Sequence, residues 1–125
     1  MSVRAWMVGL LLALVLGAGV AEAGRGKLDG KTFKVMITEP GRKAYPDTLV
    51  FTNGTFDAAE CHQYGFKATP YTGDAGSFAT TAKSEKEGTI VWSGTVKGDA
   101  IEGKLAWTKA GQAAITYTFA GALQK

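Results

Sequence analysis

The sequence is poor in cysteine and histidine, and each scarcity limits the folds and functional sites that the chain can form. Cys61 is the one cysteine in 125 residues, so the chain cannot form the internal disulfides that staple many small exported domains. His62 is the one histidine, and a zinc site takes at least three protein ligands, so Asp or Glu would have to supply the others. Stability must therefore come from a packed core and from backbone hydrogen bonds, and we expect no metal site.

Two further absences concern function. The net charge is +3, but acidic and basic residues are interspersed and form no basic stripe, so nucleic acid is not an expected partner. No G-x-S-x-G motif is present, and a cysteine and a histidine adjacent in sequence do not have the geometry of a cysteine protease. We therefore expect no catalytic residues, no cofactor and no enzymatic activity.

The N-terminal segment has the order of a secretory signal peptide. Arg4 precedes an apolar run from Met7 to Val20, and Ala21-Glu22-Ala23 is a small-x-small cleavage signal. The alternative is a membrane anchor, but spanning helices need roughly 20 apolar residues and this run is shorter. No cysteine stands at the cleavage point to carry a lipid. Residues 1–23 are predicted to be removed, leaving one domain over residues 24–125 that is periplasmic or secreted and has no membrane anchor.

The segment from Thr89 to Thr108 is typical of a β-hairpin. Two runs that alternate apolar with polar residues meet at Gly98-Asp99, and a two-residue loop with glycine first suits the turns of hairpins. A slip of one residue would exchange the two faces, so the pattern fixes the register. The expected inward pairs are Val96 with Ile101, Gly94 with Gly103, Trp92 with Leu105 and Ile90 with Trp107.

The rest of the mature chain repeats this pattern of short strands and turn residues. Asn53-Gly54 is a strong hairpin signal that sets Phe51 against Phe56 and Leu49 against Ala58. Pro70 suggests a sheet edge or a bulge. Further strands are predicted at 31–38, 48–52, 55–62, 66–72, 77–83 and 113–123. The short sequential connections predict an all-β fold, a small antiparallel meander barrel of about eight strands, because closure removes both edges.

The segments LDGKTF, DTLVFTNGTF, CHQYGF, PYTG and KEGTIVWSGTVKGDAIEG together resemble a group of small exported bacterial proteins without an assigned activity. The resemblance covers nearly the whole mature chain and implies a lipocalin-like fold or small β-barrel. It implies no catalytic residue. A weaker similarity, confined to the segment from Phe51 to Cys61, is to the META domain of bacterial stress proteins.

The alternation of inward and outward positions does not decide how the polar residues Glu60, Cys61 and His62 are oriented. Neighbours on a strand point to opposite faces, so Cys61 and His62 cannot readily share a metal or a haem. The simpler interpretation is a small buried apolar Cys61 and a partly exposed His62. Strict alternation from Phe56 turns Glu60 and His62 inward, where the pair would anchor a ligand, whereas a bulge near Ala58 would turn Cys61 inward instead.

Aromatic residues are the best evidence for function. The inward faces carry Phe33, Phe51, Phe56, Phe78, Trp92, Trp107, Tyr117 and Phe119. Most such stripes are plain core, but Gly94 and Gly103 lie beside the two indoles and either make room for them or leave space for a ligand. The candidate ligand-binding residues are Trp92, Trp107, Gly94, Gly103, Tyr117, Glu60 and His62.

These observations favour an exported, non-enzymatic binding protein that takes a small apolar or aromatic ligand in the mouth of a β-barrel. An eight-stranded barrel is just wide enough either to be filled by side chains or to hold one small ligand. The alternative is a periplasmic protein-interaction module, an inhibitor or an envelope stress factor, that acts through its outer surface. A cavity would favour the first function, and a filled barrel with an exposed apolar patch the second.

Overall fold

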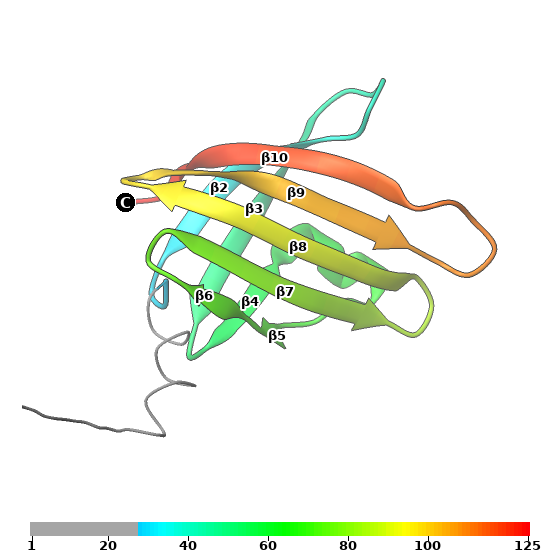
Figure 1. Ribbon diagram of the computed structural model, residues 1–125, viewed down its shortest axis with the longest axis horizontal. Coiled ribbons are helices and arrows are strands. Elements are labelled where there is room, and N and C mark those ends of the chain that lie inside the picture. Colours follow the sequence, from blue (N-terminus) through cyan, green and yellow to red (C-terminus); the bar gives the residue numbers. More distant parts are fainter. Residues whose placement is uncertain (1–27) are drawn as a thin grey trace, which may run out of the picture.

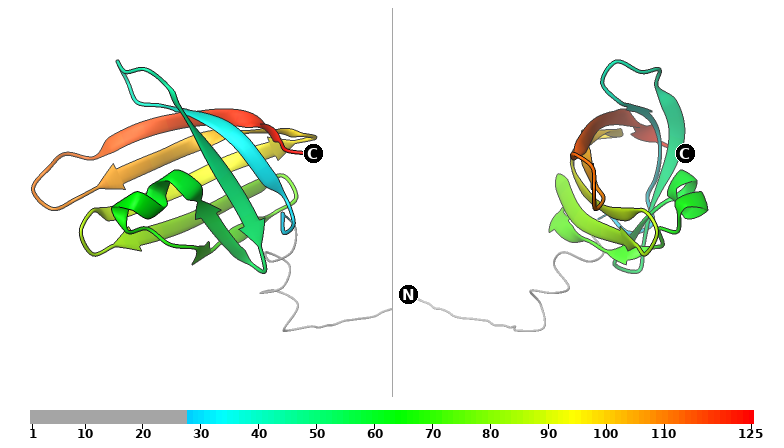
Figure 2. Two further views of the ribbon diagram at one scale, coloured as in Figure 1. Left: turned by 180° about the vertical axis from the view of Figure 1, so that it is seen from behind. Right: turned by 90° about the vertical axis from the view of Figure 1, so that its right-hand side faces the viewer.

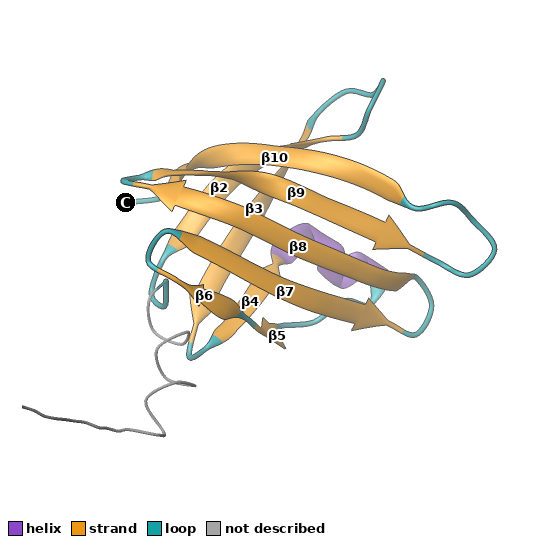
Figure 3. Ribbon diagram, in the orientation of Figure 1, coloured by secondary structure: helices purple, strands orange, loops and turns teal. Residues whose placement is uncertain are grey.

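The computed structural model describes residues 28–125, so the predicted signal peptide at residues 1–23 lies outside the described part of the chain. Nine strands and one short 3₁₀ helix make up this domain (Figures 1 and 3). In chain order they are β2 (Thr32–Thr38), β3 (Tyr45–Thr52), β4 (Thr55–Ala58), η1 (Ala59–Tyr64), β5 (Thr69–Pro70), β6 (Thr72–Asp74), β7 (Ser77–Ser84), β8 (Gly88–Lys97), β9 (Ala100–Thr108) and β10 (Ile115–Leu123). Within residues 28–125, no helix has the length and apolar character needed to cross a membrane.

The strands form one antiparallel sheet that curls into a barrel, as the sequence predicts. The order is β5-β4-β3-β2-β10-β9-β8-β7-β6, so neighbours follow each other along the chain except where β2 pairs with β10. That pairing joins the first long strand to the last, with Phe119 opposite Ile37. Figure 2 shows the strands curving around a common axis, with η1 beside the ring. The meander topology is therefore confirmed.

Both predicted hairpins have the predicted register. Across β8 and β9, Gly94 pairs with Gly103 and Trp92 pairs with Leu105, and across β3 and β4, Phe51 pairs with Phe56. At the second turn Asn53 and Gly54 have φ angles of 50° and 78°. These are the left-handed values that a tight turn of this kind demands and that Asn and Gly adopt at least cost.

The barrel closes through one extended segment, residues 69–74, which pairs with a strand on each side of the seam. Its first part, β5, pairs with β4, and its second part, β6, pairs with β7. Side chains of β5 and β7 complete the seam, because the Thr80 hydroxyl donates to the carbonyl of Pro70 at 2.6 Å and the Thr69 hydroxyl donates to the carbonyl of Thr81 at 3.1 Å. Pro70 thus lies on an edge strand, where its missing N–H removes no hydrogen bond from the centre of the sheet.

Two of the predicted strands, those over 55–62 and 66–72, differ from the structure because of the segment between Ala58 and Phe66. The strand predicted over 55–62 ends at Ala58, and residues 59–64 form η1 instead. The strand predicted over 66–72 is replaced by β5 and β6, and Phe66 is a buried loop residue with 5% exposure. A 3₁₀ helix this short has no amphipathic period that a sequence pattern can reveal.

Aromatic side chains fill one end of the barrel. Phe51 lies at the centre of this cluster, with ring centroids 5.0 Å from Tyr71, 5.0 Å from Phe78 and 5.3 Å from Phe56. Leu28 closes this end and is fully buried, and its N–H donates to the hydroxyl of Tyr71. The half of the barrel next to Leu28 is therefore a packed core with edge-to-face aromatic contacts.

Gly94 and Gly103 belong to this filled half. A Cβ on Gly94 would lie 2.7 Å from Cε1 of Phe78, and a Cβ on Gly103 would lie 2.8 Å from Cζ of Phe119. The glycines therefore make room for phenylalanine rings, rather than for the two indoles or for a ligand.

Candidate functional site

The other end of the barrel is hollow. A cavity of about 370 Å³ opens there, between the loops that follow β2 and β7, the ends of β3, β9 and β10, and the side chains of η1. Its floor is apolar and consists of Phe66, Ile90 and Leu105, which are 5%, 6% and 3% exposed. The barrel is thus packed at the end near Leu28 and open at the end where η1 lies, so it is neither wholly filled nor wholly empty.

Aromatic residues form the walls of the cavity. Tyr45 begins β3, Tyr64 ends η1, and Trp107 and Tyr117 lie on β9 and β10, with Tyr45 and Tyr64 42% and 52% exposed at the mouth. Large exposed aromatic side chains at the mouth of a cavity offer apolar surface to an entering molecule.

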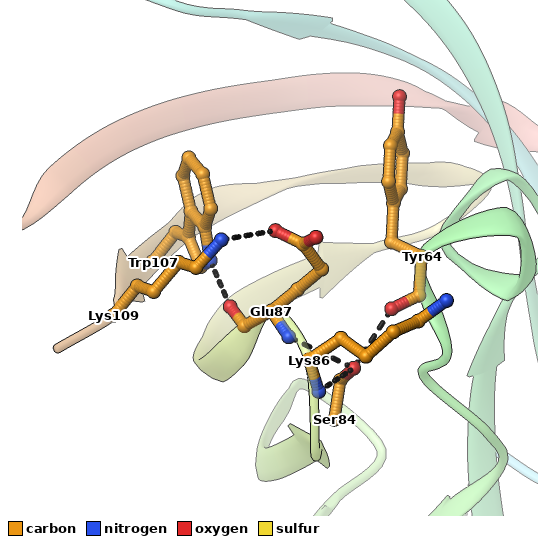
Figure 4. A network of polar contacts seen from close by, with 6 residues as sticks. All are labelled: Tyr64, Ser84, Lys86, Glu87, Trp107 and Lys109. Atoms are coloured by element: carbon orange, nitrogen blue, oxygen red, sulfur yellow. Dashed lines mark hydrogen bonds and ion pairs between the residues drawn. The ribbon is translucent and has the colours of Figure 1, made fainter.

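Hydrogen bonds fix the rim of the cavity (Figure 4). Trp107 Nε1 donates to the carbonyl of Glu87, and Lys109 Nζ lies 3.1 Å from Glu87 Oε1. The Ser84 hydroxyl donates to the carbonyl of Tyr64 at 2.8 Å and accepts from the N–H of Glu87 at 3.1 Å. The turn between β7 and β8 is thereby tied both to β9 and to the end of η1, so the indole and the helix keep fixed positions around the opening.

Asp47 is a buried carboxylate in the wall of the cavity. It lies on the inward face of β3, two residues before Leu49, and is 3% exposed. Its Oδ1 accepts hydrogen bonds from the N–H groups of Thr48 at 2.7 Å and Glu60 at 2.9 Å, whereas Oδ2 has no hydrogen-bond partner in residues 28–125. Burial raises the pKa of this carboxyl, and the two N–H donors oppose that shift. A buried acceptor without a partner is costly, and in native proteins it calls for an explanation.

Three hydroxyl and thiol groups of the wall, those of Tyr45, Cys61 and Tyr117, are held in their neutral forms at neutral pH. Burial, with the nearby charge of Asp47, raises the pKa of the Cys61 thiol to about 12. Burial also raises the pKa of Tyr45 and of Tyr117. A thiol kept protonated in this way is the opposite of an activated nucleophile, which needs a lowered pKa.

The structure brings three of the predicted site residues together. Trp107, Tyr117 and Glu60 all line the cavity. Glu60 does so from the first turn of η1 rather than from a strand, and the Glu60–His62 pair that strict alternation would have turned inward is not formed.

The other four predicted residues lie elsewhere. Trp92 is 1% exposed and packs against Phe56 in the core, with ring centroids 4.9 Å apart. Gly94 and Gly103 border a broad, open concavity of about 820 Å³ on the outer surface of the sheet. His62 is exposed on η1, where its Nε2 lies 2.7 Å and 2.9 Å from the carboxylate oxygens of Asp57 on β4.

No protein-family model, curated protein or solved structure matches the chain. The function must therefore be inferred from the chemistry of the site. Across residues 28–125, no three His, Cys, Asp or Glu side chains are grouped so that they could hold a metal ion.

The sequence-based prediction missed Asp47, Tyr45 and Tyr64. The strand predicted over 48–52 excludes Tyr45 and Asp47, although β3 begins at Tyr45 and its alternation places Asp47 on the same face as Leu49 and Phe51. That alternation was the available signal. Tyr64 carried none, because its position depends on η1.

Cys61, whose orientation the sequence left undecided, lines the cavity and packs against the core, half-buried. The bulge near Ala58 that an inward Cys61 requires on a continuous strand is not needed, because β4 ends at Ala58 and η1 turns the chain.

Proposed function

We propose that this protein, exported to the periplasm or secreted, is a non-enzymatic binding protein that takes a small, largely apolar or aromatic ligand in the open end of its barrel. The observation that carries the proposal is the cavity of about 370 Å³, which falls within the usual range of small-molecule sites. An apolar floor, aromatic walls and a few convergent polar groups are the usual composition of such sites.

The division of the barrel into a packed half and a hollow half further supports this proposal. The packed half supplies the core and the rigid hairpins. The hollow half is framed by hydrogen-bonded side chains, so the site is largely preformed and loses little entropy on binding.

The test is a fluorescence titration of the mature protein with small aromatic probes, because Trp107 lies in the cavity wall and Trp92 lies in the core. Trp92→Phe should retain a saturable shift in emission, since Trp107 remains as the reporter. Trp107→Phe should lose most of that shift, although the chain still folds. A wild-type protein that responds to no probe at millimolar concentration would refute the proposal.

One observation favours a second candidate function, a protein-interaction module. The outer concavity of about 820 Å³ is bordered by Met36, whose side chain is 48% exposed. If the cavity binds nothing, this surface becomes the better candidate, and contact with a protein partner would then be the function to test.

A further inference from the structure

The charge of the cavity wall is opposite to the charge of the protein. The chain has a net charge of +3, yet the residues that line the cavity include four carboxylates and no Lys, Arg or His. The four are Glu39, Asp47, Glu60 and Glu87. A concave site with one sign of charge concentrates ligands of the other sign.

Two of these carboxylates already have cationic partners at the rim. Glu87 pairs with Lys109 at 3.1 Å, and Glu39 lies 3.7 Å from Arg42. Asp47 and Glu60 form no ion pair within residues 28–125, so the negative charge that remains uncompensated lies on the side where β3 meets η1.

Asp47 gives this charge a specific acceptor atom. Its Oδ2 is buried without a hydrogen-bond partner, while Oδ1 is fully engaged by two backbone N–H groups. Asp47 lies on the inward face of β3 and lines the cavity, so a hydrogen-bond donor that enters through the cavity would complete this atom. Contact requires a small side-chain rearrangement of the kind that often accompanies binding.

The aromatic walls are suited to the same kind of group. The rings of Tyr45, Tyr64, Trp107 and Tyr117 surround the opening, and the faces of such rings attract cations. A molecule with an ammonium group on an apolar body could therefore pack both parts against these rings. Its N–H groups could donate hydrogen bonds to the carboxylate.

We infer that the cavity selects an organic cation: a primary ammonium group carried on an aromatic or apolar body, with the ammonium group at Asp47 and the body against Trp107, Tyr117 and the apolar floor. This inference rests on the proposed binding function and adds the charge of the ligand to it. Neutral molecules of the same shape should bind more weakly, and anions most weakly of all.

The experiment compares three molecules that differ mainly in one terminal group. At pH 7, 4-phenylbutylamine is a cation, 4-phenyl-1-butanol is neutral and 4-phenylbutyrate is an anion. Binding of each to the mature protein is measured by calorimetry and by Trp107 emission. We expect the amine to bind at least tenfold more tightly than the alcohol, and the carboxylate to bind more weakly than the alcohol.

Asp47→Asn is the variant that tests the contact, because it keeps the Oδ1 acceptor for Thr48 and Glu60 while removing the charge. It should abolish the preference for the amine and leave the affinity for the alcohol within about twofold. Glu102→Gln removes one negative charge from an exposed site on the outer surface, away from the cavity, and should leave the preference intact. Circular dichroism establishes that each variant folds.

The outcomes separate this inference from the proposed function. Equal binding of amine and alcohol would overturn the inference and leave the cavity as a site for neutral ligands. A preference that persists in Asp47→Asn would overturn the role of Asp47. Failure of all three molecules to bind would overturn both the inference and the proposed function.

Discussion

The carboxylate of Asp47 on β3 accepts a hydrogen bond of 2.9 Å from the backbone N–H of Glu60, and this bond joins the barrel wall to the start of η1. The same carboxyl is 3% exposed and has one oxygen without a partner, so it combines a structural contact with an uncompensated buried acceptor. The position of η1 beside the cavity therefore depends on the carboxylate of Asp47, although burial makes the charged form of this carboxylate unfavourable.

Asp47→Asn should change how the stability of the protein depends on pH. Burial raises the pKa of Asp47 in the folded chain above its ordinary value of 3.8. Below pH 3.8 both states hold the proton. As the pH rises from 3.8 through the folded pKa, the unfolded chain loses its proton first, so Asp47 reduces the stability of the wild type. Urea denaturation between pH 3 and 7 should show the variant gaining stability relative to wild type across this window.

Other ionisable groups lie near Asp47 and are present in both proteins: Tyr45 on its own strand, Glu60 and Cys61 on η1, and Asp57 on β4. Comparing the variant with wild type at each pH therefore isolates the contribution of Asp47. A difference in unfolding free energy that stays constant, or that shrinks as the pH rises, would contradict the raised pKa.

Asp47→Ala should loosen η1, because it removes the acceptor for Glu60 N–H that Asn preserves. A backbone donor left without its partner opens more readily to solvent. Amide hydrogen exchange at Glu60 should be faster in Asp47→Ala than in Asp47→Asn, while exchange in β8 and β9 stays unchanged. Equal protection of Glu60 in both variants would mean that other contacts hold η1 in place.

The hairpins could be predicted from the sequence because their information is local. Gly98-Asp99 and Asn53-Gly54 specify the turns, and the alternating residues on either side fix the register, as the pairing of Trp92 with Leu105 shows. The pairing of β2 with β10 was implied only by barrel closure, and it too is present.

The site could be predicted less well, since it depends on where a strand ends. The apolar alternation Phe56, Ala58 does not reveal that the chain turns into η1 after Ala58. That turn places Cys61 and Tyr64 in the cavity wall and leaves His62 outside with Asp57. Trp107 and Tyr117 were identified because regular alternation extends to the ends of their strands.

Cys61 should react slowly with alkylating reagents, because only the thiolate is a nucleophile. A pKa raised from 9.0 to about 12, mainly by burial and then by the charges of Asp47, Asp57 and Glu60, lowers the thiolate fraction near neutral pH. The rate with iodoacetamide at pH 8 should be lower than in urea by a factor on the order of 1000. Between pH 7.5 and 10 the rate in the folded protein should rise about tenfold per pH unit, and a plateau near pH 9 would show an unshifted thiol.

Gly103→Ala should destabilise the protein, because the added methyl group has no space. Its Cβ would lie 2.1 Å from the carbonyl oxygen of Ser93 and 2.8 Å from Cζ of Phe119, so β8 and β9 would have to separate locally or the ring would have to move. Overpacking of this kind costs about 1–3 kcal/mol. Gly76→Ala is the matched control, because its Cβ would meet atoms at the ordinary distances of 3.7 Å and 3.8 Å, and Gly76 is not among the glycines with positive φ. Urea denaturation followed by tryptophan emission should show a lower midpoint for Gly103→Ala and a midpoint near that of wild type for Gly76→Ala. Equal midpoints for the two variants would mean that the hairpin can open beside Phe119 at no cost, and that this half of the barrel is not the rigid support that the cavity requires.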